Sequence, residues 1–362
     1  MCSSSWRSRE HASHKDIDLY TLLHGALKNV GDFLIYERAK QLIKTHKPGA
    51  QFLEISRYES LEPYLGQINQ TRAIILCGGP GYRRDFYPGT FALTSDLMRI
   101  RVPIIPFGLG WSGYPAGHPE RFQFTSASLK AIRFIHNRCQ QSSCRDVLTL
   151  GILRRHGIKN AVMSGCPAWY DLPSLGRAFQ PPQAIRQIVV TTPRRIRLVP
   201  QAVQLLWAAF RQFPDTVRYC VFHRGYRRDA HTSARKAWPM RMLVLAANLF
   251  HYQIVNAAYD LSRIAFYREC DLHIGYRVHA QINFLSMRKP SLLLCEDGRG
   301  EGLSQTLDLY DLPAYDNPKA VLQIMQRLRG DLENGFRRFA TVAQRIDTVY
   351  ESVLVPFLGS IP

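Results

Sequence analysis

The segment Cys270-Asp-Leu-His-Ile-Gly-Tyr-Arg-Val-His-Ala280 changes from a strand pattern to a helix pattern at Gly275. A short apolar run ends at this glycine and a helical pattern begins just beyond it, which is typical of a strand-turn-helix unit. Arg277 and His279 then lie in the first helical turn, beside free N–H groups and the positive end of the helix dipole. We interpret His273 as a packed strand residue. The segment therefore predicts an anion site that contains a titratable imidazole.

The same alternation of short apolar runs and helical patterns extends along the chain and indicates an α/β fold with mainly parallel sheets. The expected strands are Gln51–Ile55, Ala73–Leu76, Pro103–Phe107, Ala161–Met163, Ile188–Thr191, Val217–Phe222, Gln253–Val255, Leu272–Ile274 and Ser291–Cys295. The expected helices are Asp32–Lys44, Phe91–Arg101, Ser126–Asn137, Val147–His156, Gln201–Phe213, Tyr259–Tyr267, Val278–Met287 and Lys319–Leu328.

Chain length and local composition favour two domains. At 362 residues the chain exceeds the size at which a single core usually keeps growing. The loop-like stretch Ser174–Gln183, bracketed by prolines, is the expected linker, so we expect domains at residues 1–178 and 179–330. Tyr226–Trp238 is rich in arginine and polar residues and predicts a surface insertion. From Leu332 onward apolar residues repeat on one helical face, so residues 331–362 are expected to form a docked C-terminal helix.

Charge and cysteine usage limit the class of protein. The formal net charge of +19 favours anionic partners, although a basic and well-solvated surface explains the charge taken by itself. Met1–Asp16 is polar and lacks an apolar core, so no secretory signal is expected, and the apolar runs are too short to span a bilayer. The eight cysteines form no Cys-x-x-Cys pair, which argues against a disulfide scaffold or structural zinc and fits the cytoplasm.

Glycine-rich stretches in the first half are predicted to be turns beside strand ends. They are Leu27-Lys-Asn-Val-Gly-Asp32, Cys77-Gly-Gly-Pro-Gly-Tyr82 and Phe107-Gly-Leu-Gly-Trp-Ser-Gly113. Glycine lets the backbone approach a ligand closely, and the carboxyl ends of the strands form the binding crevice of an open α/β sheet. Turn chemistry explains any one stretch about as well as function does, but their number favours a site. Their spacing does not match the dinucleotide fingerprint, and no P-loop is present.

Charged residues also follow predicted strands in the second half. Arg194 lies in Thr191-Thr-Pro-Arg-Arg195 and Arg224 lies in Phe222-His-Arg-Gly225, both at strand ends where the crevice is expected. Arginine binds carboxylate or phosphate through paired hydrogen bonds, so a functional arginine and a solvated one are both open interpretations. For Arg145 and Asp146 we expect a structural ion pair, with Asp146 at a helix N-terminus.

In their order and spacing, several short motifs resemble those of the polysaccharide pyruvyl transferase family. The most specific is Arg277-Val-His-Ala280. The others are Asn29-Val-Gly-Asp32, Gly78-Gly79, Ser143-Cys-Arg-Asp146, Cys166-Pro-Ala168, Lys289-Pro290 and Asp297-Gly-Arg299. The resemblance implies two Rossmann-like domains that face each other across a cleft, as in the GT-B glycosyltransferases. It also implies a cytoplasmic transferase of cell-surface polysaccharide biosynthesis, which moves pyruvate from phosphoenolpyruvate to sugar hydroxyls as a ketal.

This reaction suggests roles for individual residues. Phosphoenolpyruvate must receive a proton on its methylene carbon from an acid whose pKa lies at about 7, and histidine meets that requirement. We therefore hypothesise that His279 is the general acid and that Asp32, on the opposite domain, orients or deprotonates the acceptor. The expected substrate-binding residues are Arg277 for the donor anion, Arg194 and Arg224 as secondary cations, and Asn29, Gly78 and Gly79. The chemistry requires no metal and no cofactor.

Two other functions fit parts of the sequence. A GT-B-type glycosyltransferase would bind the diphosphate of a nucleotide sugar with the same crevice and cationic helix end. A basic nucleic-acid-binding protein is less favoured because no recognisable binding module is present, so no specific nucleic acid is expected. The expected partners are phosphoenolpyruvate and a sugar or lipid-linked saccharide acceptor. Because basic residues are spread along the chain, contact with an anionic membrane is expected to be weak and peripheral.

Overall fold

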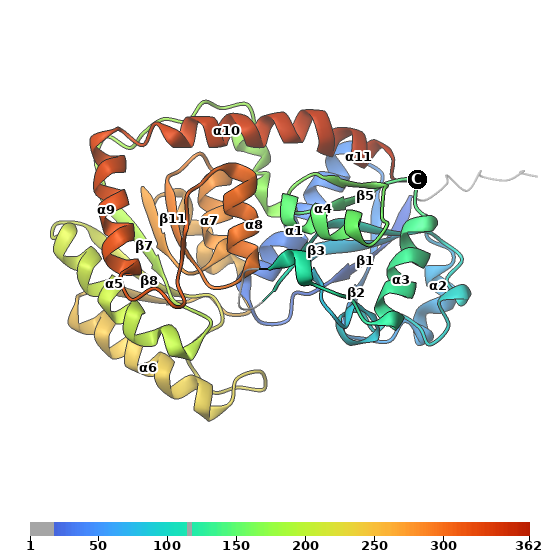
Figure 1. Ribbon diagram of the computed structural model, residues 1–362, viewed down its shortest axis with the longest axis horizontal. Coiled ribbons are helices and arrows are strands. Elements are labelled where there is room, and N and C mark those ends of the chain that lie inside the picture. Colours follow the sequence, from blue (N-terminus) through green and yellow to red (C-terminus); the bar gives the residue numbers. More distant parts are fainter. Residues whose placement is uncertain (1–17, 114–117) are drawn as a thin grey trace, which may run out of the picture.

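The computed structural model describes residues 18–113 and 118–362, which fold into two α/β domains on parallel sheets (Figure 1). The first sheet contains β1 (Leu19–His24), β2 (Gln51–Ser56), β3 (Ile74–Tyr82), β4 (Ile104–Trp111), β5 (Ser142–Cys144) and β6 (Ala161–Met163). The second contains β7 (Gln187–Thr191), β8 (Val217–Phe222), β9 (Gln253–Asn256), β10 (Leu272–Gly275), β11 (Ser291–Cys295) and β12 (Leu312–Pro313). The expectation about Met1–Asp16 lies outside the described residues.

Helices cover both sheets. Those of the first domain are α1 (Val30–His46), α2 (Leu65–Ile68), α3 (Ser126–Asn137) and α4 (Val147–Arg155). Those of the second are α5 (Val199–Gln212), α6 (Ala234–Leu249), α7 (Val278–Ser286), α8 (Gly298–Leu307) and α9 (Ala320–Glu333). The chain ends with α10 (Arg338–Val349) and α11 (Val355–Gly359). In the described part of the chain, no helix combines the length and the apolar character that a membrane span needs.

Each sheet reverses its strand order at one place. The second sheet runs β12-β11-β10-β7-β8-β9, which is the Rossmann order, and its reversal lies between β7 and β10. The first sheet runs β2-β1-β3-β4-β5-β6, and its reversal lies between β1 and β3. Ligands of open α/β sheets bind at the carboxyl ends of the strands beside such a reversal. The loops that follow these four strands are therefore the places to look for a site.

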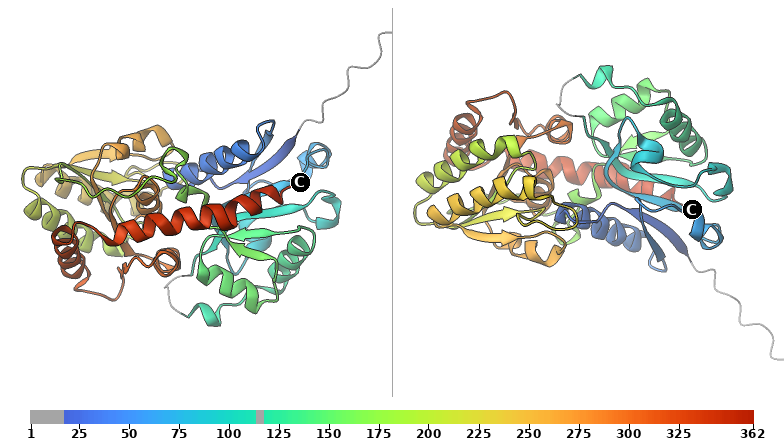
Figure 2. Two further views of the ribbon diagram at one scale, coloured as in Figure 1. Left: turned by 90° about the horizontal axis from the view of Figure 1, so that it is seen from above. Right: turned by 90° about the horizontal axis from the view of Figure 1, so that it is seen from below.

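The C-terminal helices connect the two domains, as the prediction of a docked helix required. Figure 2 shows α10 and α11 running along both domains on one side of the molecule. Phe357 of α11 is fully buried, and its ring centroid lies 5.4 Å from that of Phe107 in β4. The Tyr20 hydroxyl donates a 2.6 Å hydrogen bond to the carbonyl oxygen of Pro362. Because one hydrophobic cluster includes residues of both domains and of these helices, the tail is part of the core.

The boundaries of β6, β8 and β11 agree with the sequence prediction, whereas the predicted helix Phe91–Arg101 is wrong. That segment is a loop with a 3₁₀ turn at Leu97–Arg99. Leu93 has a φ of 47°, which a right-handed helix cannot contain, and its side chain is buried in the first-domain core. Tertiary packing of its apolar side chains therefore overrides the helical pattern of this segment.

The predicted glycine-rich turns after β3 and β4 are also wrong, because both strands continue through the glycines. Gly78 and Gly79 lie inside β3 with φ values of 52° and 77°, and the pairing with β4 is irregular between Gly79 and Tyr82. Such a bulge bends a strand without ending it. A Cβ at Gly78 would lie 2.4 Å from the Ile35 side chain of α1, so glycine is needed there for close packing.

Some elements were not predicted. The strands β1 and β5 and the helices α6 and α8 are additions, and the predicted insertion Tyr226–Trp238 becomes helical at Ala234. The predicted helix Tyr259–Tyr267 is a 3₁₀ helix at Leu261–Arg268. The strand β5 has only three residues and α8 begins with a glycine-rich turn, so neither carries a clear periodic signal. The expected linker Ser174–Gln183 lies between β6 and β7.

Candidate active site

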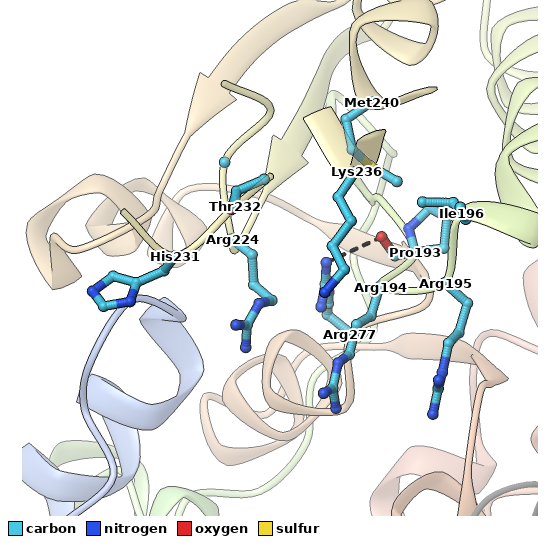
Figure 3. A pocket seen from close by; sticks show the side chains of 11 residues that line it. Pro193, Arg194, Arg195, Ile196, Arg224, His231, Thr232, Lys236, Met240 and Arg277 are labelled. Carbon is cyan, nitrogen blue, oxygen red and sulfur yellow. Dashed lines mark hydrogen bonds between the residues drawn. The ribbon is translucent and has the colours of Figure 1, made fainter. Parts of the chain in front are cut away.

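A basic cavity of about 260 Å³ lies at the carboxyl edge of the second sheet (Figure 3). Three predicted substrate-binding residues line it, namely Arg194 after β7, Arg224 after β8 and Arg277 after β10. Arg195, His231 and Lys236 add further basic side chains, and no carboxylate is among the described residues that line it. The cavity lies beside the strand-order reversal, and its basic lining is chemically complementary to a small anion.

The cations of this cavity are crowded. Burial lowers the pKa of Arg277 to about 10. Glu296 acts in the opposite direction, and the positive charges of Arg224 and Arg194 lower the pKa further. The guanidinium remains protonated at neutral pH, so the like charges repel one another and a bound anion would relieve the repulsion. Arg194 is exposed and Arg224 is half-buried, and Figure 3 shows them extending beside one another. Both side chains are accessible to a ligand.

Arg277 also builds the loop that carries Arg194. Its Nε donates to the Thr192 carbonyl oxygen at 2.8 Å and its Nη2 donates to the Pro193 carbonyl oxygen at 3.1 Å. On the other side of the loop, the buried Glu296 carboxylate accepts the backbone N–H of Arg194 at 2.6 Å. The loop is thus fixed from two sides. Arg277 therefore positions Arg194 in addition to lining the cavity.

His279 lies in the first turn of α7, where the domains meet. It is 4% exposed, and its Nε2 has no hydrogen-bond partner among the described residues. Its ring packs on the backbone of Gly31 in α1, where a Cβ would lie only 2.4 Å from His279 Nδ1. Asp32 follows Gly31 and acts electrostatically on the imidazole. The structure thus brings together His279 and Asp32, which the sequence assigned to opposite sides of the cleft.

The pKa of His279 differs from the value of about 7 that suits a general acid. Burial lowers the pKa of His279 to about 4, although Asp32 acts in the opposite direction. The imidazole is therefore neutral at pH 7 in this arrangement. An anion bound beside the imidazole would favour its charged form and raise the pKa. Protonation of His279 is thus expected to be coupled to donor binding.

Three charged residues near His279 were not predicted as site residues. Asp297 caps the N-terminus of α8 and accepts hydrogen bonds from Arg299 Nε at 2.8 Å and Nη2 at 2.7 Å. Arg145 pairs with Asp146 at 3.1 Å, which confirms the expected structural pair, but its Nη1 has no partner among the described residues. Arg299, Arg145 and Asp297 all act electrostatically on His279. Like Arg194, Arg299 follows a predicted strand, which was the available signal.

The first domain presents the other side of this region. Asn29 caps α1 without a side-chain hydrogen bond, and the next backbone N–H, that of Val30, donates to the His223 carbonyl oxygen at 3.1 Å. A Cβ at Gly79 would lie 3.6 Å from Arg57 Nη1, so of the two predicted glycines only this one lies beside a charged side chain. The start of α1, which carries Asn29 and Asp32, therefore lies against the second domain.

Arg57 and Arg83 are first-domain cations that the sequence reading missed. Arg57 is 4% exposed; its Nη2 donates to the Tyr58 hydroxyl at 2.9 Å, whereas its Nε has no partner in the described chain. Burial, and then the charge of Arg57, lower the pKa of Arg83, and Arg299 of the second domain acts in the same direction. Because Arg57 follows β2 and Arg83 follows β3, the carboxyl edge of this sheet is cationic as well.

The structure is similar to solved nucleotide-sugar enzymes. MnaA of S. aureus, solved with UDP, gives a TM-score of 0.56 at 11% identity over 93% of this chain and 95% of that one. A UDP-GlcNAc 2-epimerase from Neisseria meningitidis, bound to UDP-GlcNAc, gives 0.56 at 10% identity over 94% and 99%. No curated protein matches the chain in sequence. At these identities the likeness shows the fold, and it confirms the expected GT-B-like arrangement of two Rossmann-like domains.

The sequence also matches a family model. The model of the polysaccharide pyruvyl transferases matches residues 29–294, which is well over half of the 362 residues. The matched region begins at Asn29 before α1 and includes Arg277 and His279, so it contains both sides of the site described above. The chain therefore belongs to the polysaccharide pyruvyl transferase family of enzymes.

Proposed function

We propose that this enzyme transfers the pyruvyl group of phosphoenolpyruvate to two hydroxyls of a saccharide as a ketal. The observation that carries the proposal is the basic cavity lined by Arg277, two residues before the buried His279, on which Asp32 of the other domain acts electrostatically. Phosphoenolpyruvate carries a carboxylate and a phosphate, and arginine binds both through paired hydrogen bonds. Membership of the family supports the same donor.

The second domain binds the donor in this proposal. Arg194 and Arg224 contact its phosphate and carboxylate, because both line the cavity and have accessible side chains. Arg277 lines the same cavity and holds the Arg194 loop through the Thr192 and Pro193 carbonyl oxygens. The binding energy comes from charge-assisted hydrogen bonds in a cavity that contains no competing carboxylate among its described lining residues.

The reaction begins with the proton that His279 carries once the donor is bound. His279 Nε2, which has no partner among the described residues, donates a proton to the methylene carbon of the bound donor. One saccharide hydroxyl attacks the resulting cationic carbon, and its proton passes to Asp32. A second hydroxyl displaces phosphate from the same carbon and gives its proton to the imidazole of His279, while Asp32 passes its proton to the departing phosphate. The products are the cyclic ketal and inorganic phosphate, so atoms and charge balance.

The first domain receives the acceptor. Arg57 follows β2 and Arg83 follows β3, one on each side of β1, and the pKa of Arg83 responds first to its burial and then to the charge of Arg57. Two buried or half-buried cations in this position favour an acceptor that carries an anionic group of its own. A lipid-linked saccharide has a phosphate next to its sugar and fits this requirement. We therefore favour it over a free neutral sugar.

Donor binding distinguishes this proposal from the nucleotide-sugar alternative, which the UDP-containing structural relatives support. Melting temperature is measured with phosphoenolpyruvate, UDP-GlcNAc and UDP, and phosphate release is followed by ³¹P NMR after a saccharide is added. We expect phosphoenolpyruvate to stabilise the wild type and Arg224→Ala to lose the effect. Arg211→Ala, an exposed arginine on α5, is the matched control. Stabilisation by UDP-GlcNAc alone, with release of UDP, would replace the proposal.

A further inference from the structure

The helix α6 is apolar on its outer face as well as on its inner face. Its inner residues Ala237, Met240, Leu243 and Ala247 are buried. Its large exposed apolar residues are Trp238 (66% exposed), Met242 (43%), Leu245 (60%) and Leu249 (71%). Spacings of four, three and four residues place these side chains in one stripe along the helix. We call these four residues the α6 stripe.

A stripe of this kind is unusual for a surface helix. Single exposed hydrophobic residues are normal, but several that adjoin one another mark a place where something binds. A helix that is apolar all round is ordinarily buried. Because α6 packs on α5 with its inner face only, its outer face is the part that lacks a cover.

The charge around the α6 stripe indicates the kind of partner. Arg235 and Arg241 on the helix and Arg227 and Arg228 in the loop before it are exposed. The only carboxylate in residues 226–249 is that of Asp229, and it forms an ion pair with Lys28 of the first domain. A helix that lies in the headgroup region of an anionic bilayer typically has exposed tryptophan and leucine side chains flanked by arginines.

The position of α6 relates this surface to the site. Lys236 and Met240, near the start of the helix, line the basic cavity. Figure 1 shows α6 on the side of the molecule opposite α10, and the right-hand view in Figure 2 shows it on the near surface. Lys236 and Met240 lie on the face of α6 opposite the α6 stripe, so a bilayer in contact with the stripe would be separated from the cavity by the width of this helix.

We propose that the α6 stripe, with Arg235 and Arg241, is a peripheral docking surface for an anionic membrane, which holds the enzyme at the surface where acceptors anchored in the bilayer are found. The apolar side chains enter the headgroup region and the arginines bind lipid phosphates. This docking requires no substrate, so it is tested independently of the proposed reaction. It differs from the weak contact expected from evenly spread charge, because the apolar part does not depend on salt.

The test is binding of the full chain to vesicles that contain 30% phosphatidylglycerol in phosphatidylcholine, measured by sedimentation at low and high salt. We expect binding that persists in part at high salt, and a blue shift of tryptophan emission that Trp238→Phe removes. The variant Leu245→Ser/Leu249→Ser should lower the partition coefficient by about tenfold or more. The matched control is Met98→Ser/Leu322→Ser, in which both residues are equally exposed on other elements (70% and 57%).

Each outcome decides the proposal. Loss of binding in the α6 variant, with an unchanged melting temperature and normal binding of the control, supports it. Binding that disappears at high salt and does not change in the α6 variant would show that spread charge alone is responsible, and it would overturn the proposal. If light scattering shows a dimer that the α6 variant converts to a monomer, and vesicles are not bound, the stripe is an interface between copies of this chain.

Discussion

At the scale of single residues, the site depends on contacts between the domains. Gly31 has no side chain, and this lets the His279 ring pack on the first turn of α1. The contact buries the imidazole and places Asp32 beside it, and both effects change its protonation. Arg277, at the start of the same helix, donates hydrogen bonds to two backbone carbonyl oxygens. The two residues of the Arg277-Val-His-Ala280 motif therefore have separable functions.

Replacing His279 tests proton delivery. His279→Gln keeps much of the size of the side chain but cannot act as an acid near neutral pH, so turnover should fall by about 10²-fold or more with donor affinity nearly unchanged. Because burial lowers the pKa of His279 to about 4, the protonated fraction of the free enzyme decreases as pH rises. The wild-type kcat/KM should therefore decrease from about pH 5 to pH 8, and the variant should lose this His279 component. Near-normal turnover of His279→Gln would disprove the acid assignment.

Replacing Arg277 tests donor binding. Arg277→Lys keeps the positive charge but cannot bind both the Thr192 and the Pro193 carbonyl oxygens with a planar group. The Arg194 loop should loosen, and the phosphoenolpyruvate concentration at half-maximal rate should rise by about tenfold, with a smaller change in turnover. Steady-state kinetics and the donor-induced shift in melting temperature measure the effect, with Arg211→Lys as control. A variant with unchanged donor dependence would show that the loop does not need Arg277.

At the scale of elements, the charged groups of the cavity lie at strand ends, and the C-terminal helices pack against both domains. The loops after β7, β8 and β10 line one cavity, because parallel strands end at the same edge of their sheet. The helices α10 and α11 pass from the second domain to the first, and α10 packs against α7, which carries His279. Packing of the tail is thus linked to the position of the site.

The tail can be tested through Phe357. Phe357→Ala removes a fully buried ring that packs 5.4 Å from the ring of Phe107, so the free energy of unfolding should fall by about 3–5 kcal/mol. Urea unfolding followed by circular dichroism measures this change. Leu322→Ala, which removes a 57% exposed side chain, should change stability by less than about 0.5 kcal/mol. Equal effects of the two substitutions would mean that the tail is not part of the cooperative core.

At the scale of the whole molecule, buried neutral histidines couple stability to pH. Burial lowers the pKa of His136 to about 4 and of His273 to about 3, and it also lowers those of His279 and His223. Between these values and the unfolded value of about 6.5, the unfolded chain binds more protons than the folded one. Stability is therefore present above the unfolded pKa and is lost as pH falls. Asp311, whose pKa burial raises to about 7, acts in the opposite direction.

The melting temperature should accordingly decrease as pH is lowered from 7 to about 5, because the histidines outnumber the opposing carboxyls of Asp311 and Glu296, whose pKa burial also raises. His136→Gln removes one of them, so the slope of the free energy of unfolding against pH should decrease by up to about 1.4 kcal/mol per pH unit. His118→Asn, at an exposed site, is the control. A melting temperature that rises on acidification would contradict this prediction.

Much of the fold could be predicted because its signals are local. The boundaries of β8 and β11 follow from short apolar runs, and the helix after Gly275 follows from a change of period. The segment Phe91–Arg101 does not form the predicted helix, because its apolar residues are spaced as in a helix but Phe91, Leu93 and Ile100 are buried separately in a loop. The predicted strands end earlier than β3 and β4 do, because glycine ordinarily signals a turn. Only tertiary packing shows that these glycines lie within strands.

The sequence by itself determined where the charged residues of the site lie along the chain: Arg194, Arg224 and Arg277 follow strands, and His279 begins a helix. The periodicity of apolar residues and the local cap and turn residues indicate where strands end and helices begin, so one sequence is sufficient to find these positions. Only the tertiary structure decided which residues meet. The contact of Gly31 with His279, the low pKa of that imidazole and the exposed outer face of α6 all depend on burial. Burial is a property of two surfaces brought together from distant parts of the chain, and no local pattern specifies it.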